Sequence, residues 1–366
     1  MADYGPGFSP QSMAMPPTPQ EVKHSIKSQI ATVLAVVLIT FQGNGCRKAP
    51  EKSSNHAATQ ARLTVLVDSL HAAIEKTEHD TVRLAAAVED AYRRLGELPA
   101  TEPGPYLLAE NGVLHRPSAM KENVPAVFVS GAVPVDQSLI QTVERTERID
   151  PVLIDLVKSN FEVVQSYYND RNSYNRIYPP FDVLTQYPAG MDIPAYNFYY
   201  LADEAHNPDR EAVWVKEPYV DPAGRGWMVS CIAPVYHQDR LEGVAGLDIT
   251  TSALVRSLEL ETTNELAMVV AHDGTLVAAG EAMARILRLP PLKNHRYVDT
   301  VRSDTFRPER YNLLRSSAPE IRAAFAELLS NGKETDILRL DSHQWLIYGR
   351  PIKHLGWYMF VFEPES

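Results

Sequence analysis

The chain has 366 residues, with 35 Lys or Arg against 46 Asp or Glu, which gives a formal net charge of −11. The length suits two domain-sized cores or one domain with two lobes, and a charged share of 22% excludes a mainly disordered chain. The acidic balance argues against nucleic-acid partners, and two Cys exclude a disulfide framework or a Cys-rich zinc site. Many of the 17 Tyr lie between positions 167 and 236, which is the first indication of a binding pocket.

Residues 1–45 are predicted to be a leader with a disordered start. Lys23 and Lys27 precede an apolar run, residues 30–41. A helix of that length spans about 18 Å, less than the ~30 Å core of a bilayer. A basic flank followed by a short apolar run is typical of a signal peptide.

Cys46 comes directly after Gly45 at the end of this leader. A small residue before such a cysteine resembles a bacterial lipoprotein cleavage site, so we expect lipidation of Cys46 and a membrane anchor at the cell envelope. A secreted form, an uncleaved leader that acts as the anchor, and a cytosolic protein are the alternatives. Residues 46–60 are polar and predict a tether.

Two helical stretches are predicted next. Apolar residues recur at steps of three and four from Ala61 to Leu95, which predicts one long amphipathic helix. Residues 137–168 predict a second helical stretch, interrupted at Asp150 and Pro151. Asp150 is expected to be an N-cap there, with proline at the first helical position.

The rest of the chain predicts antiparallel β-structure in two lobes. Two β-rich runs separated by a four-residue polar turn predict a hairpin over residues 226–249. Further strands are expected at 267–271, 275–279, 345–348 and 357–362, with a helix over 319–329. We therefore expect an α+β fold with a first lobe in residues 61–260 and a second lobe in residues 261–366. Because the chain ends directly after the second lobe, signalling would require a partner such as a membrane receptor or kinase.

Several segments carry a family resemblance: Trp214 with residues 217–222, residues 229–236, residues 243–248, and the shorter stretches 176–180 and 355–358. Together they resemble the double-Cache sensor domains. The resemblance implies an extracytoplasmic module with two PAS-like lobes stacked along a long N-terminal helix. It also implies that a small ligand binds in the lobe distal from the membrane.

The resemblance also implies ligand-binding residues. Residues 197–200 fall where amino-acid-binding members have an Arg-x-Trp-Tyr segment that holds the ligand carboxylate. Tyr219 and Asp221 match a Tyr-x-Asp pair, and Asp248 matches a Gly-x-Asp aspartate, which together hold the ligand ammonium. Asn197 stands where the arginine is expected. The resemblance therefore implies an amine-bearing or amino-acid-like ligand without the charged carboxylate clamp.

The chemistry of these residues supports an amine. Two aspartates that face one aromatic pocket repel each other unless a cation or a proton lies between them. Asp221 and Asp248 would balance the amine, and Tyr199, Tyr200 and Tyr219 would form the walls. As alternatives, Asp221 starts a turn, Asp248 caps the following helix, and Tyr199 and Tyr200 alternate across a strand so that one of them faces the core.

We expect no catalysis, no metal and no cofactor. The 11 His are scattered without metal-ligand spacing, and no Gly-rich phosphate loop or nucleophile elbow occurs. Trp214, Trp227 and Trp357 are expected to be core residues. Two other functions stay open: a structural envelope protein that binds no ligand, and a hydrolase that uses Ser230.

Overall fold

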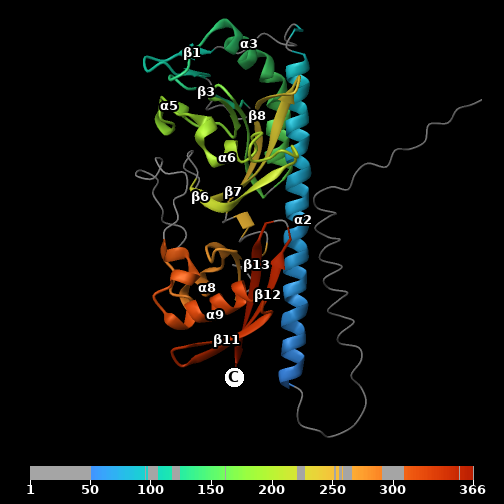
Figure 1. The fold of residues 1–366 in the computed structure, drawn as a ribbon, viewed down its shortest axis with the longest axis vertical. Helices are drawn as coiled ribbons and strands as arrows, with labels where there is room; N and C mark the ends of the chain where they lie inside the picture. The colour runs from blue at the N-terminus through green and yellow to red at the C-terminus, as the bar shows by residue number, and fades with distance from the viewer. Residues whose placement is uncertain are drawn as a thin grey trace, which may run out of the picture. The chain divides into compact units, whose positions relative to one another are not determined.

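The described residues form a long helix and two antiparallel sheets, with shorter helices beside each sheet (Figure 1). The computed structural model describes residues 51–94, 96–97, 106–117, 124–160, 162–220, 227–250, 253–254, 258, 266–290, 309–353 and 355–365. The predicted leader and Cys46 lie outside these residues. Within them, no helix has both the length and the apolarity needed to cross a membrane.

The first lobe is built on an eight-stranded sheet with strand order β1-β2-β3-β5-β4-β8-β7-β6. Its strands are β1 (Leu107–Leu108), β2 (Leu114–His115), β3 (Ala126–Val129), β4 (Val163–Asp170), β5 (Tyr174–Tyr178), β6 (Val213–Val220), β7 (Trp227–His237) and β8 (Arg240–Thr250). Its helices are α3 (Gln137–Arg145), η1 (Thr146–Ile149), α4 (Asp150–Ser159), α5 (Val183–Gln186), η2 (Ile193–Ala195) and α6 (Asn197–Tyr200). The predicted hairpin is confirmed as β7–β8.

The second lobe is built on a five-stranded sheet with strand order β10-β9-β13-β12-β11. Its strands are β9 (Ala267–Ala271), β10 (Leu276–Ala279), β11 (Thr335–Leu340), β12 (His343–Ile352) and β13 (Trp357–Glu365). Its helices are α8 (Glu281–Ile286), η3 (Glu309–Tyr311), η4 (Leu313–Arg315) and α9 (Pro319–Ser330). The strands and the helix predicted for this region are confirmed.

Helix α2 (Glu51–Arg93) packs against both sheets through one apolar face. Leu66 and Leu70 pack with residues of β9, β12 and β13. Leu84 and Val88, about four helical turns farther along, pack with residues of β3, β4 and β5. The fold class predicted from the sequence is confirmed: a long N-terminal helix packs against two antiparallel lobes.

The helix begins at Glu51, ten residues before the predicted start at Ala61. The prediction of a tether over residues 46–60 is therefore wrong for residues 51–60. Contacts to the second sheet explain the difference, because the Thr59 hydroxyl donates to Glu363 Oε2 over 3.1 Å. His56 Nδ1 lies 2.7 Å from the Tyr348 hydroxyl. Tertiary contacts thus extend the helix into a polar stretch that has no apolar period.

The second helical stretch also differs from the prediction. It consists of α3, η1 and α4 and ends at Ser159, and strand β4 follows from Val163 to Asp170. Pro151 lies in the first turn of α4 as predicted, but the N-cap is Ile149, so the prediction that Asp150 is the N-cap is wrong. The Asp150 carboxylate accepts from two arginines instead.

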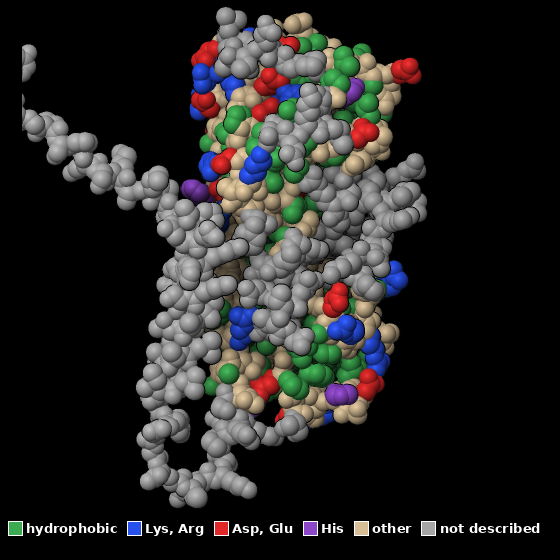
Figure 2. Space-filling model, turned by 180° about the vertical axis from the view of Figure 1, so that it is seen from behind, with side chains coloured by type: hydrophobic (Ala, Val, Ile, Leu, Met, Phe, Trp, Pro, Cys, Tyr) green, Lys and Arg blue, Asp and Glu red, His purple; other side chains and the backbone are tan. Residues whose placement is uncertain are grey.

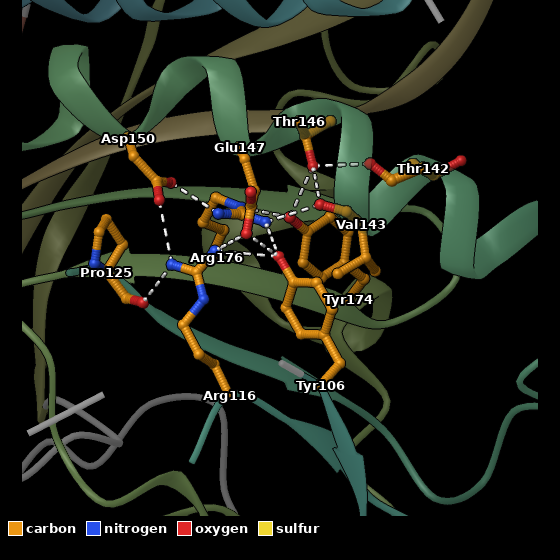
Figure 3. Close-up of polar contacts among 10 residues, drawn as sticks. All are labelled: Tyr106, Arg116, Pro125, Thr142, Val143, Thr146, Glu147, Asp150, Tyr174 and Arg176. Atoms are coloured by element: carbon orange, nitrogen blue, oxygen red, sulfur yellow. Dashed lines mark hydrogen bonds and ion pairs between the residues drawn. The ribbon is translucent and has the colours of Figure 1, made fainter. Parts of the chain in front are cut away.

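These arginines form a buried charge cluster under the first sheet (Figure 3). Arg116 is 4% exposed and Arg176 is fully buried. Asp150 accepts from Arg176 Nη1 over 2.6 Å and from Arg116 Nη1 over 3.0 Å, and Glu147 pairs with Arg116. The Tyr106 hydroxyl accepts from both guanidinium groups over 2.9 Å. Two positive and two negative charges therefore balance each other where α4 and η1 cover the sheet.

Candidate functional site

The cavity in the first lobe lies on one face of its sheet. Side chains alternate between the two faces of a strand, so every second residue shares a face. Gln165, Tyr167 and Asn169 of β4 line the cavity, together with Asn175 and Ile177 of β5. The residues between them, such as Tyr168, point to the opposite face.

The cavity has a volume of about 30 Å³, which is room for one or two water molecules. Four side chains cover it from the segment that contains α5, η2 and α6: Tyr187, Met191, Ile193 and Phe198. A ligand with several non-hydrogen atoms therefore requires that this covering segment shift.

Asp248 of β8 is the charged residue among the described lining residues, and it is 3% exposed. In the sheet register it lies opposite Gln165 of β4 on one side and Ser230 of β7 on the other. The Ser230 hydroxyl donates to Asp248 Oδ1 over 2.5 Å. The Tyr167 hydroxyl lies beside both groups, and burial together with the Asp248 charge raises the pKa of Tyr167.

Asp248 does not cap the following helix, so that alternative is wrong. Strand β8 continues to Thr250, whose hydroxyl oxygen accepts from the Ala253 backbone N–H over 3.1 Å. Since Thr250 takes the capping role, the Asp248 carboxylate stays on the cavity face of the sheet.

The close packing of Tyr167 accounts for the glycine in the Gly-x-Asp sequence of residues 246–248. Gly246 and Asp248 lie two residues apart and share the cavity face. A Cβ atom at Gly246 would lie 2.2 Å from Tyr167 Cζ. The glycine therefore leaves room for the Tyr167 ring, which lies across β8 toward Asp248.

The cavity also contains buried amide groups that our sequence analysis missed. Gln165 is fully buried, and neither its Nε2 nor its Oε1 has a hydrogen-bond partner among the described residues. Asn175 donates from Nδ2 to Asn169 Oδ1 over 2.8 Å, and Asn175 Oδ1 has no partner in the same part of the structure. Residues 165–170 are all polar or tyrosine, so no alternation along the strand marked this face, and the helix predicted through Tyr168 assigned part of the segment to the wrong element.

The segment 197–200 is helix α6, so the prediction that Tyr199 and Tyr200 alternate across a strand is wrong. Asn197 and Tyr199 are both buried, at 4% exposed, and Phe198 between them lines the cavity. Burial raises the pKa of the Tyr199 hydroxyl. Tyr200 is half-buried, and its ring centroid lies 5.2 Å from that of His206. This helix therefore covers the cavity, but none of its three predicted site residues lines it.

Two predicted site residues cannot be placed. Asp221 and the side chain of Tyr219 lie outside the described residues. The expected pairing of Asp221 with Asp248, and the alternative that Asp221 starts a turn, both stay predictions.

The opposite face of the sheet has its own buried carboxyl group, Asp170, beside a cleft of about 340 Å³. The Tyr92 hydroxyl of α2 donates to Asp170 Oδ2 over 2.9 Å, and the Asn172 backbone N–H donates to Oδ1 over 2.6 Å. Burial raises the pKa of Asp170 to about 6, although these donors and nearby Arg171 oppose the shift. Tyr168 also bonds Tyr92 over 2.8 Å, so helix α2 is tied to the back of the sheet.

This raised pKa predicts a pH dependence of stability. In the folded chain Asp170 holds its proton up to about pH 6, but in the unfolded chain only to about pH 4. The free energy of unfolding relative to Asp170→Asn should therefore be largest below pH 4, fall as the pH rises to about 6, and then level off. Urea denaturation of both proteins across this range measures the difference, and two parallel curves would contradict the assignment.

Two of the three tryptophans predicted in the core are confirmed there. Trp214 and Trp357 are buried, with ring centroids 6.5 Å apart, while the Trp227 side chain lies outside the described residues.

Among the described residues no group of His, Cys, Asp and Glu could hold a metal ion. On the described surface in Figure 2, Lys and Arg are interspersed with Asp and Glu and form no basic patch.

The sequence matches no protein-family model and no curated protein. Solved structures of bacterial chemoreceptor domains are similar to this chain. The ligand-binding domain of Pseudomonas fluorescens CtaA in complex with L-alanine has 14% identity and a TM-score of 0.49, with 85% of this chain and 97% of that chain covered. The sensory domain of Campylobacter jejuni Tlp3 with isoleucine bound has 11% identity and a TM-score of 0.48, with coverages of 87% and 98%. The ligand-binding domain of Pseudomonas aeruginosa PctC in complex with GABA has 14% identity and a TM-score of 0.45, with coverages of 85% and 100%. At identities this low, the similarity does not assign a ligand to this chain.

Proposed function

We propose that this chain is an extracytoplasmic small-molecule sensor that binds an amine-bearing or amino-acid-like ligand in the first lobe and catalyses no reaction. The buried carboxylate of Asp248 supports this proposal most. It lies beside the cavity, and the other described lining residues are neutral. A buried carboxylate is costly unless a cation or hydrogen-bond donors compensate it. A ligand ammonium supplies both.

The lining of the cavity suits such a ligand. The rings of Tyr167, Tyr187 and Phe198 lie around the cavity and offer cation–π contacts. None of the described residues that line the cavity is cationic, so the described lining offers no guanidinium clamp; the resemblance implies an arginine at position 197, which is Asn197. The ligand therefore needs a positive charge more than it needs a carboxylate.

The anchor and the partner rest on the sequence alone. The leader and Cys46 support a lipid-anchored protein of the cell envelope, with an uncleaved leader as the alternative anchor. A membrane receptor or kinase would then bind this protein and transmit the signal. Growth in labelled palmitate followed by mass spectrometry of the N-terminal peptide tests lipidation, and a palmitate-free peptide with an unmodified Cys46 would contradict it.

Replacing Asp248 with asparagine tests the proposed site. We expect at least about a tenfold loss of affinity for the best member of a panel of small amines, measured by isothermal titration calorimetry. The fold should persist, because an asparagine oxygen still accepts from Ser230. Asp170→Asn is the matched control, since it removes an equally buried carboxylate from the opposite face of the same sheet. Unchanged amine affinity in the Asp248 variant would contradict the site.

A structural envelope protein without a ligand is the second candidate, and the small cavity volume favours it. Thermal shifts with amines, amino acids and organic acids separate the two functions. A ligand at 100 times its dissociation constant adds about 2.7 kcal/mol to the free energy of unfolding. No shift with any compound at millimolar concentration would support the structural role.

A further inference from the structure

Gln165 is a buried amide whose hydrogen-bonding capacity the described protein leaves unused. Its side chain is fully buried and lines the cavity, and its Nε2 and Oε1 have no partner among the described residues. A buried polar group without a hydrogen bond costs free energy, and native proteins contain few of them. An amide in this position is therefore ready to bond a molecule that enters the cavity.

The register places this amide next to the proposed counter-charge. Gln165 and Asp248 lie directly opposite each other on β4 and β8. Side chains at such positions have Cβ atoms about 5 Å apart on the same face. One small ligand can therefore bond both groups at once through neighbouring atoms.

We propose that Gln165 selects the group that neighbours the ligand's ammonium, an inference that rests on the proposed function. Gln165 Oε1 accepts from the ammonium that Asp248 balances, and Gln165 Nε2 donates to a neutral oxygen that is three bonds away from the ammonium nitrogen. The ligand class is then an amine with an adjacent carbonyl or hydroxyl group, such as an α-amino amide or an amino alcohol. A free α-amino acid fits less well.

Charge explains the preference for a neutral group. A carboxylate on the carbon next to the ammonium would lie within several ångströms of Asp248, where burial strengthens the repulsion. None of the described lining residues is cationic. Arg176 follows Asn175 on β5 but points to the opposite face, where Asp150 binds it over 2.6 Å. A cationic ligand leaves the pair with Asp248 neutral, whereas a zwitterion leaves one uncompensated negative charge.

The test compares L-alaninamide with L-alanine, which share size and stereochemistry but differ at the carboxyl group. By isothermal titration calorimetry, the wild-type chain should bind L-alaninamide at least about tenfold more tightly than L-alanine. Gln165→Met, which keeps the shape and removes the amide, should reduce this preference to less than about threefold. Thermal unfolding of the variant without ligand should show no loss of stability, because the variant removes an unpaired buried group.

Four outcomes separate this inference from the proposed function. The inference is supported if the preference exists and depends on Gln165. It is overturned if L-alanine binds as tightly as L-alaninamide, or if Gln165→Met keeps the preference. It is also overturned if neither probe binds at millimolar concentration. In each of these cases the proposed function still stands if another amine binds and Asp248→Asn abolishes that binding.

Discussion

Replacing Arg176 with methionine is expected to lower the free energy of unfolding by about 3–5 kcal/mol, because breaking a buried ion pair leaves an uncompensated charge. The Asp150 carboxylate would lose its bond from Arg176, and the Val143 carbonyl would lose a donor at 2.6 Å. The Tyr174 hydroxyl, which accepts from Arg176 Nε over 2.6 Å, would lose its charged partner as well. Urea denaturation followed by circular dichroism measures the change.

Arg83→Met is the matched control, because it removes an arginine–aspartate pair from the surface. Arg83 pairs with Asp155, and both side chains are about half exposed, at 46% and 56%. A second, longer ion pair joins Arg83 Nη1 to Asp80 Oδ1 over 3.8 Å within helix α2. Exposed pairs of this kind contribute only about 0–1 kcal/mol. Equal losses in the two variants would contradict the stabilising role of the buried cluster.

Replacing Gly246 with alanine should damage the site and the stability together. The new methyl group would meet Tyr167 Cζ at 2.2 Å, so the ring must move away from Asp248. Inserting a methyl group into a packed core costs about 1–3 kcal/mol. We also expect amine affinity to fall at least about tenfold, since Tyr167 walls the cavity and its hydroxyl lies beside the Asp248 carboxylate.

Gly349→Ala distinguishes loss of stability from loss of binding. Gly349 lies on β12 in the second lobe, where a Cβ atom would meet Phe360 Cε1 at 2.4 Å. The steric conflict is similar, but the cavity residues are not involved. We expect a comparable drop in melting temperature with unchanged amine affinity. If Gly246→Ala binds amines with the same affinity as the wild-type chain, Tyr167 does not form a wall of the binding site.

The architecture could be predicted where the hydrophobic period was strong. Helix α2 and the β7–β8 hairpin have long regular runs of apolar residues, so the secondary structure of both was predicted correctly. The start of α2 was predicted too late because Thr59 and its neighbours are polar and are stabilised by contacts to distant residues such as Glu363. Strand β4 was predicted as helix because Tyr167 and Tyr168 are both buried, one on each face, so that strand shows no alternation of apolar and polar residues.

The site could be predicted only in part. Asp248 was named from its match to the Gly-x-Asp motif, and the structure gives that spacing a local steric cause at Gly246; its role in binding stays a prediction. Gln165 and Asn175 come together with Asp248 through strand pairing, which no local pattern in the chain reveals. The tyrosine-rich stretch mixes residues that line the cavity, such as Tyr187, with residues of the opposite face of the sheet, such as Tyr174.

A crystal structure of residues 47–366 with the tightest-binding member of the amine panel would show directly whether Asp248 binds the ligand amine. We expect the ligand nitrogen to lie about 2.8 Å from an Asp248 carboxylate oxygen, as in a charge-assisted hydrogen bond. We also expect the segment with Tyr187 and Phe198 to be displaced, because a cavity of about 30 Å³ cannot hold the ligand otherwise. An amine bound beside Asp170 on the opposite face, with Asp248 still bonded only within the protein, would contradict the assignment of Asp248 as the counter-charge.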